Sequence, residues 1–342
     1  MQSIQDEPLD KALNQYNIKV LSIRNESYKE KKGVWWIQTD NGYKILKKIS
    51  NSENTLKYIL SAVNHLCQKG IKIPKVNKTK DGSDYSNING TCFVLSDAEN
   101  GKNPSYSSPA ELKLIVQELG KFHIASEGFS PLSDTKPKIH LGIWIEDYEN
   151  ELEDMNKFYL QDLKNNQNGE IGKLIINEFP FFYERANNAI KGLKGQEYKN
   201  WVEKVRNSGC LCHQDFAAGN LFLDSKGNVY ILDTDSLTID IPARDIRKLL
   251  NKIMKKLGKW DLNLTKSFIE YYQTTNPLSA QEWKVVMYDL MFPHLFLGAM
   301  NKFYYKRDKE WTYQKYLKRI KEMSEFEKTL GPILENFEKI IK

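Results

Sequence analysis

The segment from Cys210 to Asp245 constrains the fold more than any other part of the chain; it reads CLCHQDFAAGNLFLDSKGNVYILDTDSLTIDIPARD. It holds the spacing H-x-D-x-x-x-x-N at His213, Asp215 and Asn220, and a further acid, Asp233, closes an apolar stretch downstream. A single Asp in a turn is most often a cap or a solvated side chain. The complete series in this order is far less expected by chance, so it predicts a site.

Two short apolar stretches frame this series. Residues 221–223 and 229–232 have strand character, and residues 224–228, DSKGN, carry Gly and Asn, which tolerate positive φ in a tight turn. Two such stretches around a turn predict a β-hairpin. Because Asn220 precedes the first strand and Asp233 follows the second, the hairpin would bring both side chains together at its open end.

This set of side chains suits phosphoryl transfer. The protein in such reactions mainly positions groups and neutralises charge, with a base for the acceptor hydroxyl and oxygen ligands for the metal. Asp215 fits the base, and Asn220 and Asp233 fit the ligands, because Mg²⁺ prefers hard oxygen donors and shares its remaining sites with phosphate and water.

Several segments resemble one known group of proteins. Besides the H-x-D-x-x-x-x-N element, these are YKILKKI at 43–49, GIKIPKV at 70–76, LGKFHIASEGF at 119–129 and DIPARDI at 240–246. Together they resemble the aminoglycoside phosphotransferase and choline kinase superfamily, a branch of the protein-kinase-like fold, and within it the CotS family of bacterial spore-coat proteins. The resemblance implies that His213 braces the loop and that Asp245 ties the loop to the following helix. It also implies that Asp235 could supply an oxygen ligand to a second metal ion; a solvated acid is the alternative.

The resemblance implies an α+β, two-lobed protein-kinase-like fold with a small antiparallel-sheet lobe and a larger, mainly helical lobe. We expect a nucleotide-binding lobe over 1–96, a hinge and connection over 97–109, and a catalytic and acceptor-binding lobe over 110–342. Residues 18–23, 34–39 and 43–49 have strand character, with a hairpin turn at Asp40-Asn41-Gly42. An amphipathic stripe predicts a helix over about 53–69 with Ser52 as its N-cap. In kinase-like folds the loop between the first two strands, here residues 24–33, covers the phosphates. With one Gly it lacks a glycine-rich cradle, so a solvated hairpin tip is the favoured interpretation, and an approach of its lysines to phosphate as point charges is the alternative.

Lys47 is the residue that the resemblance assigns to the α- and β-phosphates of ATP. Lys44 and Lys48 are rivals on the same strand, although Lys48 alternates to the opposite face. The order apolar-apolar-Lys at 45–47 favours Lys47. The family places a Glu mid-helix to orient this lysine, but the matching position here is near Ile59 or Leu60, and Glu53 in the first turn is a weak substitute.

Bulk properties exclude several other classes of protein. The chain has 342 residues, a net charge of +6, basic residues spread along its length and no nucleic-acid module, so nucleic acid is not expected as a partner. It has no apolar run of membrane-spanning length and no signal peptide. Four cysteines form no disulfide framework and no evident metal motif, and reduced thiols predict a cytoplasmic location. The resemblance adds the spore coat as a location.

The sequence therefore predicts an ATP- and Mg²⁺-dependent phosphotransferase acting on a hydroxyl of a small molecule, with nucleotide and acceptor as its partners and other spore-coat proteins as further partners implied by the resemblance. Two alternatives stay open. One is a nucleotide-binding pseudokinase that serves as a scaffold, which the missing helix Glu favours. The other is a structural coat component that binds no nucleotide.

Overall fold

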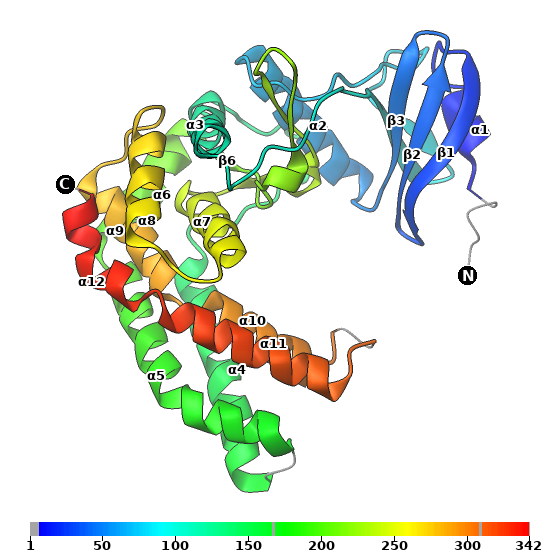
Figure 1. The fold of residues 1–342 in the computed structure, drawn as a ribbon. Helices are drawn as coiled ribbons and strands as arrows, with labels where there is room; N and C mark the ends of the chain where they lie inside the picture. The colour runs from blue at the N-terminus through cyan, green and yellow to red at the C-terminus, as the bar shows by residue number, and fades with distance from the viewer. Residues whose placement is uncertain (1–6, 166–167, 308–309, 342) are drawn as a thin grey trace. The chain divides into compact units, whose positions relative to one another are not determined.

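The computed structural model describes residues 7–165, 168–307 and 310–341. The chain forms two compact units (Figure 1). The first, which we call the sheet unit, comprises Met1–Ile115, Gly128–Lys138 and Ala217–Thr238. The second, the helical unit, comprises Val116–Glu127, Ile139–Phe216 and Ile239–Lys342.

A five-stranded antiparallel sheet forms the frame of the sheet unit, with the strand order β1-β2-β3-β5-β4. Its strands are β1 (Val20–Lys29), β2 (Lys32–Thr39), β3 (Gly42–Ile49), β4 (Ser86–Ile88) and β5 (Thr91–Asp97). Two helices accompany it, α1 (Leu9–Leu13) and α2 (Glu53–Gln68).

The two faces of this sheet carry different side chains because successive residues of a strand point to opposite sides. On one face, Trp35, Leu46 and Phe93 are buried with α1 in a hydrophobic core. On the other face, Val34, Ile45 and Val94, among others, line a cavity. The strand pattern thus separates a packing face from a binding face.

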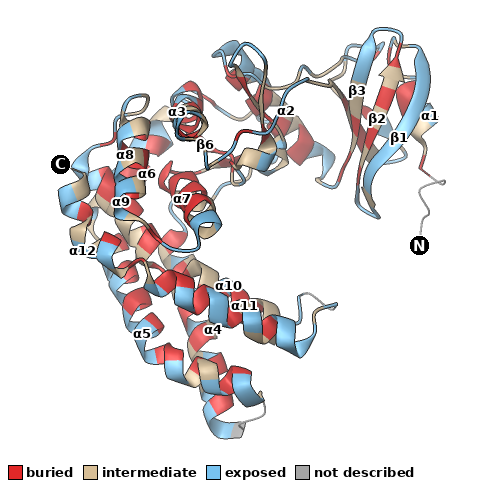
Figure 2. Cartoon of the chain, viewed as in Figure 1, coloured by how far each residue is buried: buried red, intermediate tan, exposed pale blue. Residues whose placement is uncertain are grey.

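The strands of the first hairpin are longer than the sequence predicted. Residues 24–33 are not a loop: β1 continues to Lys29, β2 starts at Lys32, and the turn is confined to Glu30 and Lys31. The solvated hairpin tip is therefore the correct interpretation. β1 is exposed along almost its entire length (Figure 2), so its sequence has no alternating apolar signal, and pairing with β2 decides its structure.

Other local predictions are confirmed. The turn between β2 and β3 lies at Asp40 and Asn41, and Gly42 takes a φ of 95°, which favours glycine. Ser52 caps α2, since its hydroxyl accepts a hydrogen bond from the Thr55 backbone N–H at 3.3 Å. The predicted later hairpin also forms, from β7 (Leu221–Leu223) and β8 (Val229–Ile231), paired antiparallel.

The helical unit contains most of the helices. α3 (Pro109–Ala125) begins in the sheet unit and ends in the helical unit. α4 and α5 lie side by side as a long pair, as do α10 and α11 (Figure 1). No helix in the described ranges combines the length and apolar character needed to cross a bilayer. The remaining elements are α4 (Trp144–Asn165), α5 (Gly169–Leu193), α6 (Gln196–Ser208), β6 (Leu211–Cys212), β9 (Thr238–Ile239), α7 (Ala243–Leu257), α8 (Leu262–Gln273), α9 (Ala280–Met291), α10 (His294–Tyr304), α11 (Tyr313–Lys328) and α12 (Gly331–Ile340).

A buried carboxylate ties four of these helices together. Asp289 on α9 accepts hydrogen bonds from Tyr148 on α4 at 2.5 Å and from the Arg247 Nε on α7 at 2.9 Å. His294 of α10 places Nε2 at 2.9 Å from the same carboxylate. Burial, followed by the positive charge of Arg247, lowers the pKa of His294 to about 4.

This His294 pKa predicts acid sensitivity. Because the pKa is about 4 folded and near 6.5 unfolded, the unfolded chain binds more protons between these values, so stability falls as pH drops from 6.5 towards 4. We expect His294 to account for a loss of about 2 kcal/mol between pH 6.5 and about pH 4.5. Urea unfolding at both pH values tests this. His294→Gln should flatten the dependence, and an equal slope in variant and wild type would contradict the assignment.

Candidate active site

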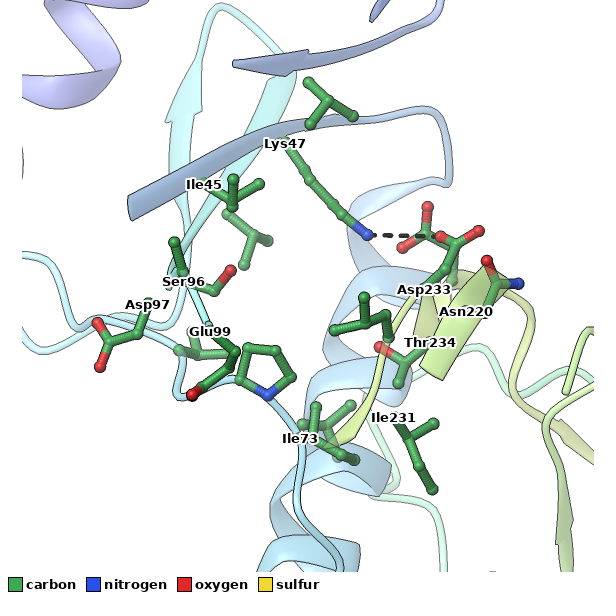
Figure 3. A pocket seen from close by; sticks show the side chains of 18 of the residues that line it. Ile45, Lys47, Ile73, Ser96, Asp97, Glu99, Asn220, Ile231, Asp233 and Thr234 are labelled. Carbon is green, nitrogen blue, oxygen red and sulfur yellow. Dashed lines mark hydrogen bonds and ion pairs between the residues drawn. The ribbon is translucent and has the colours of Figure 1, made fainter. Parts of the chain in front are cut away.

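A cavity of about 530 Å³ opens in the sheet unit, a volume typical of small-ligand sites. Apolar side chains of the sheet and of α2 form its walls. Polar groups enter it from β3, from the segment after β5 and from the open end of the β7–β8 hairpin (Figure 3). The lining residues include Val34, Trp36, Ile45, Lys47, Ile59, Leu60, Ile73, Pro74, Val94, Ser96, Asp97, Ala98, Glu99, Gly219, Asn220, Ile231, Asp233 and Asp235.

Lys47 and Asp233 face each other inside this cavity. The Lys47 side chain extends from β3, and its Nζ lies 3.4 Å from Asp233 Oδ1 (Figure 3). Asp233 lies two residues after the end of the hairpin strand β8 and has φ 54° and ψ 57°, in the left-handed region. A non-glycine residue in this region is uncommon, and such conformations cluster at functional sites.

Asn220 lies beside Asp233 at the open end of the hairpin (Figure 3). The Leu232 backbone N–H donates to the Asn220 carbonyl at 2.9 Å, which closes the hairpin one residue before Asp233. Asn103 donates from Nδ2 to the Leu221 carbonyl at 2.8 Å on the other side. The hairpin thus brings Asn220 and Asp233 to one wall of the cavity, opposite Lys47.

The two rival lysines of β3 have other partners. Lys44 Nζ lies 2.6 Å from Asp97 Oδ1, and Lys48 Nζ lies 2.5 Å from the buried carboxylate of Glu7. Neither lysine lines the cavity. Strand alternation places Lys48 on the α1 face, where its charge is neutralised away from the cavity.

Glu53 does not replace the helix Glu that the family uses. Its carboxylate accepts hydrogen bonds from the Tyr85 hydroxyl at 2.5 Å and from Asn87 Nδ2 at 2.9 Å. Ile59 and Leu60 line the cavity with apolar side chains. Lys47 pairs instead with the carboxylate of Asp233, across the cavity.

The end of β5, at Ser96 and Asp97, and the next two residues, Ala98 and Glu99, form the edge of the cavity. Burial would raise the pKa of Asp97, but hydrogen bonds from Lys44 and Asn77 lower it below its ordinary value. Burial raises the pKa of Glu99, and the neighbouring carboxylate of Asp97 adds to this effect. This edge therefore carries one tightly paired acid and one acid with an elevated pKa.

Asp215 belongs to the helical unit, where it follows β6. Its carboxylate forms an ion pair with Lys252 of α7, and about half of the side chain is exposed. The preceding residue, Gln214, has a φ of 70°. Lys248 holds Gln214 through both its carbonyl, at 2.9 Å, and its Oε1, at 2.7 Å.

Asp245 of α7 also holds this loop, as the family resemblance implied. Its fully buried carboxylate accepts hydrogen bonds from the backbone N–H of His213 at 2.5 Å and of Gln214 at 2.8 Å. His213 in turn accepts the Asp215 backbone N–H on Nδ1 at 3.3 Å, which matches the bracing role inferred from the sequence. His213 is buried and packs against Phe216.

One group of metal-type side chains occurs in the described residues. The ligand atoms of His123, Cys212 and Asp245 all lie within 4.8 Å of one another. These atoms already have partners: His123 Nδ1 contacts the Tyr272 hydroxyl at 2.7 Å, and Cys212 donates to the Ile241 carbonyl at 3.2 Å. Burial raises the pKa of the Cys212 thiol, which disfavours the thiolate that a metal requires. We therefore assign His123, Cys212 and Asp245 a structural role.

Comparison with known proteins now decides the family. Residues 11–337 match the family model described as "Spore coat putative kinase YutH". The chain belongs to this family. It is 27% identical to spore coat protein S of Bacillus subtilis (strain 168), over 99% of this chain and 96% of that protein. It is also 22% identical to the endospore coat-associated protein YutH of the same strain, over 87% of this chain and 83% of that protein.

Solved structures share the fold of this spore coat kinase-like chain. An aminoglycoside phosphotransferase from Alicyclobacillus acidocaldarius matches with a TM-score of 0.77 and 16% identity, over 96% of both chains. Spectinomycin phosphotransferase in complex with ADP and spectinomycin matches at 0.58 and 13% identity, over 96% of this chain and 98% of that one. An amicoumacin kinase in complex with AMP-PNP, Ca²⁺ and Ami matches at 0.59 and 15% identity, over 94% and 92%. The predicted α+β protein-kinase-like fold is confirmed.

Two further residues of this family member, Lys248 and Lys252, hold the loop around Asp215 and were not predicted from the sequence. Lys248 and Lys252 lie three and seven positions after Asp245, so all three fall on one face of α7. Their contacts follow the order of the loop. Asp245 contacts residues 213 and 214, Lys248 contacts residue 214, and Lys252 contacts residue 215. The spacing was visible in the sequence, but nothing there indicated which face of α7 meets the loop.

Proposed function

We propose that this protein is an ATP- and Mg²⁺-dependent phosphotransferase that acts on a hydroxyl of a small molecule. The observation that carries the proposal is the pairing of Lys47 with Asp233 across a cavity of suitable volume, with Asn220 beside it. Nucleotide complexes of proteins with the same fold support it, since these contain ADP or AMP-PNP.

The donors in the cavity fit a hard divalent ion. Asp233, Asn220 and Asp235 supply carboxylate and amide oxygens to the same cavity, and oxygen is the ligand that Mg²⁺ prefers. Mg²⁺ bound there would neutralise charge on the phosphates. Lys47 would bind the α- and β-phosphates as a point charge. The edge of the cavity at residues 96–99 would bind the adenine ring.

Asp215 is the proposed base for the acceptor hydroxyl. The acceptor oxygen forms a bond to the γ-phosphorus while the bond from that phosphorus to the β,γ-bridging oxygen breaks, and ADP leaves. The hydroxyl proton passes to Asp215 late in the step. Lys252 forms an ion pair with the Asp215 carboxylate and so places a positive charge beside the proposed base.

A nucleotide-binding pseudokinase is the second candidate. The apolar Ile59 and Leu60 at the mid-helix position, together with the engagement of Glu53 by Tyr85, favour it. The names of the relatives support an association with the spore coat in either case, and other coat proteins are then partners.

Binding of Mg·ATP tests the proposal and separates it from a purely structural role. At a hundred times its Kd, Mg·ATP should raise the free energy of unfolding by about 2.7 kcal/mol. Asp233→Ala should remove the part of this gain that depends on Mg²⁺. Asp84→Ala, whose carboxylate pairs with Lys78 and does not line the cavity, is the matched control and should behave as wild type. Wild-type protein that gains nothing from Mg·ATP would exclude both nucleotide-dependent functions.

A further inference from the structure

The tip of the β1–β2 hairpin cannot act as a backbone cradle for phosphate. Its turn is limited to Glu30 and Lys31, and the flanking residues Lys29 and Lys32 already pair across the strands. Gly33 is needed for packing, since a Cβ on it would lie 2.2 Å from the Trp35 ring. The hairpin therefore has side chains, and few free backbone groups, to offer a ligand.

One of these side chains reaches a wall of the cavity. Lys32 Nζ lies 3.8 Å from Oδ2 of Asp235, a residue that lines the cavity. Asp233, two residues before Asp235, has its Oδ1 3.4 Å from Lys47 Nζ (Figure 3). Two lysines of the sheet thus face two aspartates that follow β8.

These two pairs are looser than the structural pairs of the same sheet. The structural contacts of Lys44 and Lys48 measure 2.6 Å and 2.5 Å, against 3.4 Å and 3.8 Å for Lys47 and Lys32. Lys32 is also more than half exposed. An exposed and loosely held ion pair contributes little to stability, so its partners are available for exchange.

Asp235 itself is held by its backbone. Its carbonyl accepts hydrogen bonds from Lys138 Nζ at 2.7 Å and from Asn51 Nδ2 at 3.4 Å. Neither contact uses the Asp235 carboxylate. The backbone of Asp235 is therefore held independently of the ion pair between its carboxylate and Lys32.

We propose that Lys32 is a phosphate-binding residue that replaces the missing glycine-rich cradle. Without nucleotide, Asp235 holds Lys32 and Asp233 holds Lys47. When nucleotide and divalent ion bind, the two lysines form ion pairs with the phosphates. The carboxylates of the two aspartates then become available to the divalent ion. A lysine ammonium suits this role, because it binds phosphate as a compact point charge on a flexible stem. This inference rests on the proposed function.

Nucleotide titration of the full chain tests the role of Lys32. Lys32→Gln should weaken Mg·ATP binding about tenfold, as expected for the loss of one charge-assisted contact, and leave AMP binding within about twofold of wild type. The matched control is Lys31→Gln, one residue earlier in the exposed turn, which should change neither Kd by more than about twofold. Calorimetry gives both constants. Equal effects of the two variants, or equal losses for ATP and AMP, would overturn the inference.

Removal of the Asp235 carboxylate should strengthen, not weaken, the binding of ATP in the absence of metal. Asp235→Asn frees Lys32, so ATP in excess EDTA should bind about threefold more tightly than to wild type. Weaker or unchanged binding would count against the exchange. If wild type binds neither ATP nor AMP, the proposed function fails together with this inference. If it binds both and Lys32→Gln has no selective effect, only the role of Lys32 fails.

Discussion

Asp215→Asn is expected to reduce phosphoryl transfer by about a thousandfold while leaving the Kd for Mg·ATP within about twofold of wild type. The amide has nearly the shape of the carboxylate, so the loop should keep its conformation. It cannot accept the hydroxyl proton, and it loses the charge that pairs with Lys252. Transfer of the γ-phosphate to water and to a panel of hydroxyl compounds measures the first effect, and calorimetry measures the second.

The controls for this experiment separate the two nucleotide-binding functions. Asp84→Asn removes an exposed carboxylate that lies outside the cavity and should transfer phosphate at the wild-type rate. Lys252→Gln should fall between wild type and Asp215→Asn, because it removes the charge beside the base and leaves the base itself. If wild type and Asp215→Asn bind Mg·ATP equally and neither transfers phosphate, the chain is a pseudokinase.

The fold was predictable where local signals decide it. Ser52 and the amphipathic stripe marked α2, and the DSKGN turn between two apolar stretches marked the β7–β8 hairpin. The hairpin tip within 24–33 was predicted, but the extent of β1 was not, because β1 is exposed on nearly all its residues and residues 24–29 show no apolar alternation. Its conformation comes from backbone pairing with β2, which a single strand sequence does not display.

The candidate site was predictable in its residues more than in its contacts. The sequence could rank Lys44, Lys47 and Lys48 only by strand alternation and neighbouring apolar residues. Their carboxylate partners come from segments far along the chain, such as Asp97 for Lys44 and Asp233 for Lys47. Contacts of this range depend on the assembled sheet and hairpin, so no local pattern indicates them.

Asp245 is the residue whose loss should destabilise the protein most among those that hold the loop. The carboxylate is fully buried and accepts from the backbone N–H of His213 and Gln214, and His123 Nε2 lies 3.4 Å away. Burial would raise the pKa of Asp245, but the hydrogen bond and charge of His123, together with His213, lower it below its ordinary value. The group therefore remains ionised at neutral pH and serves as the acceptor for the loop.

Asp245→Ala should lower the free energy of unfolding by about 3–5 kcal/mol, because it leaves buried donors without an acceptor. Asp245→Asn keeps one acceptor oxygen and should cost less, which preserves the test if the alanine variant does not fold. Glu203→Ala breaks an exposed pair with Arg206 in the same unit and should cost only a small fraction of this. Urea unfolding followed by circular dichroism measures all three. A cost for Asp245→Ala no larger than that for Glu203→Ala would mean that the loop around Asp215 is held in some other way.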